Sequence, residues 1–166
     1  MKKCLLPLIP IFALASASRG AETANAPGRD GISMPSDYKN FRVVGVSQRS
    51  DDQSLRVILG NDIAVEAARA GRTNPWPNGA ILAKLVWKQK QSAQFPAATV
   101  PDAFSSAAFM IKDDLKFAAT AGWGWGEWVG LQQKPYDKPG FAQECVACHS
   151  SVKDQDWVFT RPGQLP

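Results

Sequence analysis

The chain has 166 residues, of which 45% are hydrophobic and 20% are charged, and its formal net charge is +4. This length suits one domain with a hydrophobic core. Cleavage of a leader at residues 1–17 would remove Lys2 and Lys3 and leave 17 basic against 15 acidic residues, a net charge of +2. Because that charge is small and no basic run is patterned, we expect no nucleic acid partner.

Residues 1–17 have the layout of a bacterial secretory signal peptide. Two lysines precede an apolar run, and Ala15-Ser16-Ala17 offers the small residues that a signal peptidase recognises. The apolar run is shorter than the ~20 residues that cross a bilayer, and prolines interrupt it. We therefore expect cleavage after Ala17, a periplasmic location and no membrane span in the mature chain. Residues 18–34 are small and polar, without apolar periodicity, which predicts a flexible mature N-terminus.

Residues 35–166 are predicted to form one mainly β (α+β) domain, in which an antiparallel sheet carries a few short helices and ends in a C-terminal helix. The expected elements in chain order are a short helix at Tyr38–Phe41, strands at Val43–Ser47 and Ser54–Leu59, a helix at Asn61–Ala70, strands at Ala80–Gln89, Ala107–Lys112 and Gly122–Val129, and a helix at Phe141–His149. A loop is expected at Gln91–Pro101. The strands show period-two alternation, and Gly and Pro separate the segments.

The most specific motif is Cys145-Val146-Ala147-Cys148-His149, near the end of the chain. Two cysteines separated by two residues and followed by histidine form the attachment signature of a c-type haem. The thiols can bond to the two vinyl groups of the porphyrin, and the imidazole can bind the iron from one side. A zinc site would need further ligands, and His149 is the only histidine in the chain. The sequence therefore predicts one covalent haem c, attached to Cys145 and Cys148, with His149 as the proximal iron ligand.

The side of the iron opposite His149 has no second histidine to bind it. The remaining candidate ligands are Met34, Met110 and Lys84. Met34 falls in the expected flexible segment, and a strand methionine such as Met110 usually packs in a core. We therefore expect an open or water-occupied sixth position, and an open iron binds small molecules as well as passing electrons.

Two features of the expected strands could serve a bound porphyrin. Lys84 lies between Leu82 and Val86 on one face of its strand, where an unpaired ammonium is costly to desolvate. Gly124 and Gly126 alternate with tryptophans, so something bulky can lie flat against that face. A porphyrin and the close packing of a neighbouring helix or strand both explain these glycines.

The position of the motif separates this chain from the common c-type cytochromes. Small electron-transfer cytochromes c usually carry it near the N-terminus, and four-helix cytochromes c′ need long upstream helices that this sequence lacks. The chain instead resembles the cytochrome P-460 and cytochrome c′-beta family. The segments that carry the resemblance span nearly the whole mature chain and are Tyr38–Phe41, Arg56–Asn61, Asn78–Lys84, Gly122–Gly124, Cys145–His149 and Asp156–Thr160.

The resemblance implies a dimeric, β-rich periplasmic haem protein with a five-coordinate iron. In the cytochrome P-460 branch a strand lysine is covalently joined to the haem edge, and the enzyme oxidises hydroxylamine to nitrous oxide or nitric oxide. Lys84 stands five residues after Gly79, which matches the position of that lysine. Alternatively, its stem packs while its ammonium reaches water or a haem propionate. In the c′-beta branch there is no cross-link, and the pocket binds nitric oxide or carbon monoxide.

Two further residues are candidates for the site. Hydroxylamine chemistry needs a group that moves protons, and Glu127 is the only acid in the strand expected at Gly122–Val129. The alternative is an exposed surface glutamate. Arg56 is a candidate to bind a haem propionate or to line the pocket, with a solvated strand arginine as the alternative.

Together these features predict a c-type haem protein with an open distal site that oxidises hydroxylamine or binds and turns over nitric oxide. A partner cytochrome would take the electrons, and the protein would be a homodimer. One alternative is a protein that binds nitric oxide or carbon monoxide without turnover. The other is a six-coordinate electron-transfer cytochrome c with Met110 as the sixth ligand.

Overall fold

A computed structural model describes residue 28 and residues 31–164. The predicted signal peptide at residues 1–17 and most of the predicted flexible segment at residues 18–34 lie outside the described residues. Within the described part, no helix is both long enough and apolar enough to cross a membrane.

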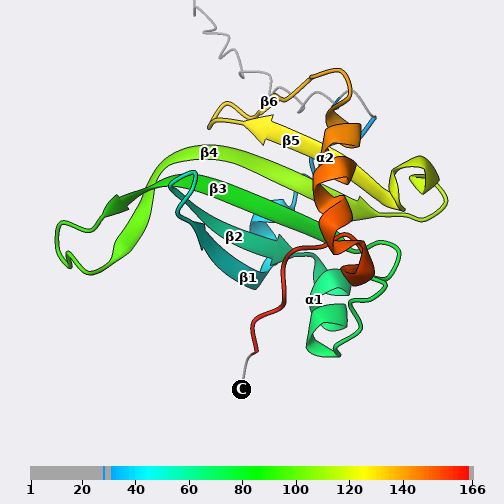
Figure 1. The fold of residues 1–166 in the computed structure, drawn as a ribbon, viewed down its shortest axis with the longest axis horizontal. Helices are drawn as coiled ribbons and strands as arrows, with labels where there is room; N and C mark the ends of the chain where they lie inside the picture. Colours follow the sequence, from blue (N-terminus) through cyan, green and yellow to red (C-terminus); the bar gives the residue numbers. More distant parts are fainter. Residues whose placement is uncertain (1–27, 29–30, 165–166) are drawn as a thin grey trace, which may run out of the picture.

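The fold is built on one antiparallel sheet of six strands in the order β1-β2-β3-β4-β5-β6 (Figure 1). The strands are β1 (Arg42–Arg49), β2 (Ser54–Gly60), β3 (Ile81–Gln91), β4 (Thr99–Lys112), β5 (Trp123–Val129) and β6 (Lys134–Pro135). Each strand pairs with the next along the chain, so the sheet is a meander without crossovers. The prediction of a mainly β fold with an antiparallel sheet is confirmed.

Short helices complete the fold and lie before β1, in the β2–β3 and β4–β5 connections, and after β6. They are the α-helices α1 (Asp62–Arg69) and α2 (Phe141–His149) and the 3-10 helices η1 (Tyr38–Asn40), η2 (Ala118–Thr120) and η3 (Ser150–Gln155). In Figure 1, α2 crosses in front of the sheet, and the C-terminal residues run down the same side. The structure confirms the helix predicted at Phe141–His149, and α1 is one residue shorter at each end than predicted.

Hydrophobic clusters cover both faces of the sheet. The cluster under α1 and α2 contains Val44, Ile58, Ala64, Val65, Ala67, Trp76, Ala80, Leu82, Trp123, Trp125, Ala142 and Val158. The cluster on the other face contains Ile32, Met34, Tyr38, Leu59, Ala83, Ala107, Phe109 and Trp128. The strand alternation produces this division, since Ile58 and Leu59 are neighbours in β2 but belong to different clusters.

Residues 31–34 are packed against the sheet, which corrects the prediction that they are flexible. Ile32 is 3% exposed and Met34 is 6% exposed. Ile32 packs against the face of β5 that contains Gly124 and Gly126, which is far away in the sequence. A Cβ atom on Gly124 would lie 2.5 Å from the Phe117 ring and 2.8 Å from Ile32 Cδ1. These glycines therefore serve close packing, and the idea that a porphyrin lies on this face is wrong.

The start of α1 is tied to β3 by a single asparagine. The side-chain oxygen of Asn61 accepts from the Ala64 N–H at 3.0 Å and from the Ile81 N–H at 3.1 Å. Its side-chain nitrogen donates to the Gly79 carbonyl at 2.8 Å. The first two bonds satisfy one free amide of the helix and one of β3. They fix where β3 begins, and β3 carries Lys84.

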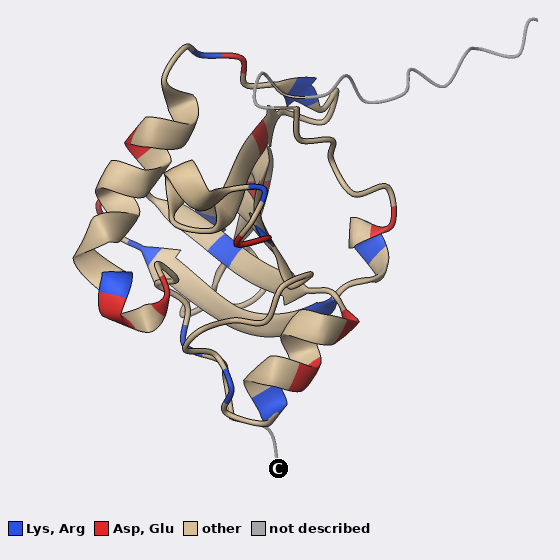
Figure 2. Ribbon diagram, turned by 90° about the vertical axis from the view of Figure 1, so that its right-hand side faces the viewer, with Lys and Arg blue, Asp and Glu red and all other residues tan. Residues whose placement is uncertain are grey.

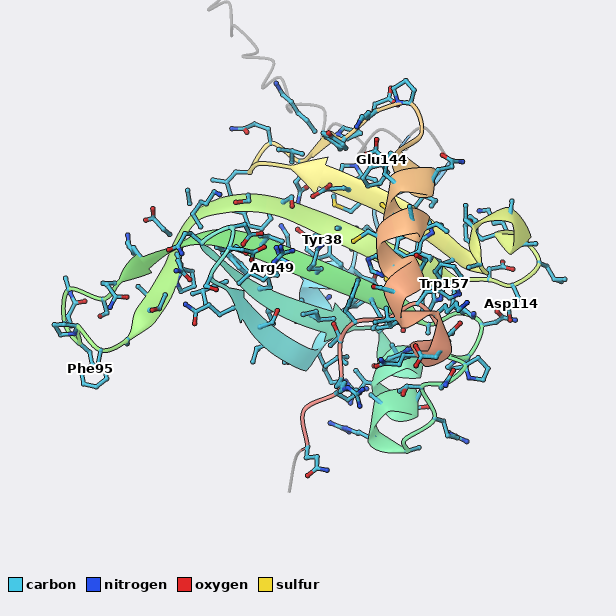
Figure 3. All side chains as sticks on the ribbon, in the orientation of Figure 1. Tyr38, Arg49, Phe95, Asp114, Glu144 and Trp157 are labelled. Carbon is cyan, nitrogen blue, oxygen red and sulfur yellow. The ribbon has the colours of Figure 1, made fainter. Side chains whose placement is uncertain are left out.

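The β3–β4 hairpin is longer than predicted. The sequence predicted a loop at Gln91–Pro101, but Gln89 pairs with Pro101 and Gln91 pairs with Thr99, so the loop covers only residues 92–98. Pro101 led to the wrong prediction because proline usually interrupts a strand. Here irregular pairing near Trp87 accommodates it. The hairpin extends beyond the other strands, with Phe95 at its tip (Figure 3).

Candidate functional site

A cavity of about 750 Å³ lies between the sheet and the segment formed by α2 and the residues after it. The cavity is lined by every residue that the sequence predicted for the site, namely Arg56, Lys84, Glu127, Cys145, Cys148 and His149. These residues come from β2, β3, β5 and α2, so the site is assembled by the topology of the whole domain. A volume of this size is typical of a pocket for a small molecule or cofactor.

Lys84 and Glu127 lie in one row across the sheet. Lys84 in β3 pairs with Ala108 in β4, and Ala108 pairs with Glu127 in β5. Side chains in such a row point to the same face, and their Cα atoms are roughly 10 Å apart across two strand spacings. Glu127 is half-buried and lines the cavity, so the alternative of an exposed surface glutamate is wrong. A cation and a carboxylate therefore face the same cavity, with only a methyl group between them.

Lys84 is partly buried and makes no hydrogen bond or ion pair with any residue in the described part of the chain. Burial lowers the pKa of its ammonium, and the nearby positive charge of Arg56 lowers it further. The carboxylate of Glu127 acts in the opposite direction. The prediction that Lys84 lies on the same face as Leu82 is confirmed, since both side chains line the cavity.

The helix α2 presents its cysteines and its histidine on one side. Cys145, Cys148 and His149 stand at positions i, i+3 and i+4, which are neighbours on a helix surface. All three line the cavity, and both cysteines are free. Cys145 is half-buried, and burial together with the charge of Glu127 raises the pKa of its thiol to about 11. The helix thus directs two thiols and an imidazole into one space.

His149 is held in one orientation and one tautomer. Its Nδ1 lies 2.6 Å from the carbonyl oxygen of Trp157. A carbonyl can only accept a hydrogen bond, so Nδ1 carries the proton, and the lone pair of Nε2 is free to bind a metal. Burial also lowers the pKa of the imidazole, which favours its neutral form. Trp157 lies beside the last turn of α2 (Figure 3).

Aromatic side chains enclose the imidazole of His149. The Trp125 ring is 4.7 Å away and the Phe159 ring is 4.8 Å away, both edge-on. The indole N–H of Trp125 is buried without a hydrogen-bond partner in the described structure. A buried donor of this kind is costly when it stays unpaired.

Three arginines line the cavity as well. They are Arg49, Arg56 and Arg161. Arg56 is held in place by Asp52 and by the Ser54 hydroxyl, and Arg49 pairs with Asp51. Acidic and basic residues are interspersed along the ribbon (Figure 2), and the three arginines bring guanidinium groups to this cavity. They fit the two propionates of a haem, since guanidinium groups bind carboxylates well.

The side chains of the cavity fit a haem. Two free thiols, an imidazole with an available Nε2 lone pair and three arginines all line one space. Among the described residues, no group of three or more His, Cys, Asp or Glu side chains could hold a bare metal ion.

A family model described as Cytochrome P460 matches residues 35–160. The chain belongs to the cytochrome P460 family. A comparison with curated proteins gave no match. Membership of the cytochrome P460 family makes this chain a c-type haem protein. The matched range begins where the predicted domain begins and includes every lining residue of the cavity except Arg161.

The methionine candidates of this cytochrome P460 domain lie in different places. Met34 belongs to the cluster on the far face of the sheet and does not line the cavity. Met110 lines the cavity, but its strand neighbour is Trp125, whose ring contacts His149. If His149 were the iron ligand, a second ligand would have to lie on the opposite side of the iron, and the position of Met110 beside Trp125 would disfavour it in that role.

Sequence reasoning missed several lining residues of the cytochrome P460 cavity. Arg49 is the last residue of β1, and Arg161 follows the last segment of the family resemblance. Nothing near either residue in the sequence indicates a pocket. Phe159 lies within the resemblance segment Asp156–Thr160 and lines the cavity, although it remains 50% exposed.

Proposed function

We propose that this protein carries one haem, attached covalently through Cys145 and Cys148, and that it oxidises hydroxylamine or binds and turns over nitric oxide at an open face of the iron. The observation that carries the proposal is the shared cavity, in which Lys84 and Glu127 face the haem-attachment motif. An electron carrier needs no proton-transfer group in its cavity, whereas hydroxylamine oxidation does.

The residues of α2 would bind and orient the cofactor. When bound, the haem would supply an iron that binds nitrogen oxides and exchanges electrons. Cys145 and Cys148 would fix the porphyrin through two thioether bonds. His149 would bind the iron through Nε2, because its Nδ1–H is already donated to Trp157. The cavity-lining arginines would bind the propionates.

Glu127 would handle protons during turnover. Conversion of hydroxylamine to nitric oxide releases three electrons and three protons for each molecule. The Glu127 carboxylate lines the cavity and is partly shielded from water, so it can accept a proton from a bound substrate. The electrons would pass to a partner cytochrome, which is the oxidant that the reaction requires.

A second function, binding of nitric oxide or carbon monoxide without turnover, is favoured by the apolar part of the lining. Ile58, Leu82, Phe141 and Val158 line the cavity beside the charged residues. Such a surface excludes water and suits a small uncharged ligand. Gas binding without turnover requires no proton transfer by Glu127. A variant of Glu127 therefore distinguishes the two functions.

The location and assembly of the protein belong to the same proposal. The signal-like sequence at residues 1–17 supports export to the periplasm, where bacterial c-type haem is attached. The family resemblance supports a homodimer. A periplasmic location also suits electron transfer to a soluble cytochrome partner.

The proposal can be tested with the exported, haem-loaded protein. Hydroxylamine-dependent reduction of an artificial electron acceptor measures turnover, and carbon monoxide titration of the ferrous protein tests for an open iron. We expect turnover in the wild type and a loss of about 100-fold or more in kcat for Glu127→Gln, the usual effect of removing a proton-transfer group. Carbon monoxide binding should remain in that variant.

The matched control is Glu144→Gln. Glu144 is an exposed carboxylate on α2 that pairs with Lys138 at 2.6 Å and does not line the cavity. Its replacement should leave kcat unchanged. Carbon monoxide binding without hydroxylamine turnover in the wild type would support the gas-binding alternative, and failure to bind carbon monoxide would support a six-coordinate electron carrier.

A further inference from the structure

A buried ion pair between Lys112 and Asp156 lies outside the cavity and has no part in the proposed function. Lys112 Nζ is 3.0 Å from Asp156 Oδ1, and the two side chains are 3% and 10% exposed. Buried pairs of this kind add little stability, because desolvation offsets most of the attraction. Such a pair can instead hold its surroundings in one specific local geometry.

Asp156 joins three separate parts of the chain. Its Oδ2 accepts from the Trp76 N–H at 2.8 Å, and its backbone carbonyl accepts from the Trp123 indole N–H at 2.9 Å. The ammonium of Lys112 lies over the Trp123 ring, 5.2 Å from its centre. Asp156 is therefore bound by the loop before β3, the end of β4 and the start of β5. The first two contact its side chain, and the third contacts its backbone carbonyl.

The backbone at this point is in an unusual conformation. Asp156 and Trp157 have φ values of 49° and 65°, in the left-handed region. Such residues cost of order 1 kcal/mol or more each and persist when the surroundings impose them. The turn directs the Trp157 carbonyl at His149 Nδ1, which it meets at 2.6 Å. The ion pair thus stands one residue away from the carbonyl that accepts the Nδ1 proton, the one hydrogen-bond partner of the imidazole among the described residues.

We infer that Lys112 and Asp156 are positioning residues for His149: they fix the Asp156–Trp157 turn, and the turn places the carbonyl that accepts the Nδ1 proton. The inference rests on the proposed function in one respect, namely that His149 binds the haem iron. A firm hydrogen bond at Nδ1 makes the imidazole a stronger electron donor to a metal at Nε2. The ion pair therefore tunes the strength of the iron–histidine bond.

The test compares holoproteins by resonance Raman spectroscopy and redox titration. Asp156→Asn removes the charge but keeps an oxygen for the Trp76 N–H, and asparagine tolerates the left-handed region. We expect the iron–histidine stretching band of the ferrous variant to shift to lower frequency and broaden, and the midpoint potential to become more positive. Lys112→Gln removes the other charge and should change both readouts in the same direction.

The matched control is Asp114→Asn. Asp114, labelled in Figure 3, is the second carboxylate at Lys112, with a distance of 2.9 Å, but it is 56% exposed, lies in the turn after β4 and is not part of the Asp156–Trp157 turn. Its replacement should leave the band and the potential at wild-type values. If Asp156→Asn yields no folded holoprotein, Lys112→Gln carries the comparison.

The two proposals fail in different ways. Suppose that the wild type has covalent haem and an iron–histidine band, and that neither Asp156→Asn nor Lys112→Gln shifts this band. That result would overturn the positioning role but not the proposed function. A wild-type protein without covalent haem at Cys145 and Cys148 would contradict the proposed function.

Discussion

Lys84 has an environment that structural packing alone does not explain. It is partly buried, its pKa is lowered by burial, and it has no ion pair with a described residue. A deprotonated amine is nucleophilic, and a lysine loses its proton more readily when it is desolvated. We predict a bond between Lys84 Nζ and a porphyrin carbon. Its formation breaks one N–H and one C–H bond, and an oxidant such as a peroxide must take up two electrons.

Mass analysis of a denaturing digest checks this prediction. The peptides that contain Lys84 and Cys145 should remain joined through the haem, with a combined mass two hydrogens below the sum of the parts. Lys88 is the control, because it lies on the same strand but is exposed to solvent; its peptide should show no haem adduct of its own. Recovery of the Lys84 peptide free of haem would rule the bond out.

Individual residues differ in how far the sequence can predict them. The motif at Cys145–His149 depends on local spacing along one helix, so the sequence predicts it fully. Lys84 was predicted because strand alternation shows which neighbours share its face. Lys112 and Asp156 were not predicted as a pair, since only tertiary folding brings the end of β4 to the turn after η3.

At the scale of elements, the N-cap residue of α1 stabilises the start of β3 as well as its own helix. Asn61 hydrogen-bonds to Ala64, Ile81 and Gly79. Loss of an N-cap side chain costs about 1 kcal/mol, up to about 2 kcal/mol, and Asn61→Ala also breaks two bonds at the start of β3. We expect its free energy of unfolding to fall by about 2 kcal/mol, measured by urea denaturation.

Asn40→Ala is the control for this prediction. Asn40 is exposed at the end of η1, and its side chain makes no hydrogen bond within the described structure. Its replacement should stay within about 0.5 kcal/mol of the wild type. Equal losses for both variants would mean that Asn61 has no special role in the connection to β3.

Helices and strands with clear signals among sequence neighbours could be predicted from the sequence, whereas a strand segment that depends on pairing with another strand could not. The helices α1 and α2 were predicted almost to the residue, because caps and flanking glycines are local signals. The first half of β4 was not predicted, since Pro101 and the polar residues around it resemble a loop. That part is held as a strand by pairing with β3, for example between Lys90 and Val100. Tertiary pairing there overrides local preference.

At the scale of the whole molecule, the two faces of the sheet are completed differently. The face covered by residues 31–41 is filled by side chains of the chain itself, including Ile32, Phe109 and Trp128, each at most 3% exposed. The face under α2 encloses about 750 Å³ of space. Protein interiors are close-packed, and unfilled space costs dispersion energy. A bound haem would therefore complete one half of the core.

This difference predicts how the protein responds to loss of the haem. In a Cys145→Ala/Cys148→Ala double variant purified without haem, backbone amides in α2 and in residues 156–161 should exchange with deuterium faster than in the holoprotein. We expect a loss of roughly 3 kcal/mol in local opening free energy, comparable to removing a large side chain from a core. Amides of Ala83, Ala107 and Phe109, whose side chains face the filled side, are the internal control and should keep their protection. Uniformly faster exchange in both halves would show instead that the sheet and α2 unfold as one unit.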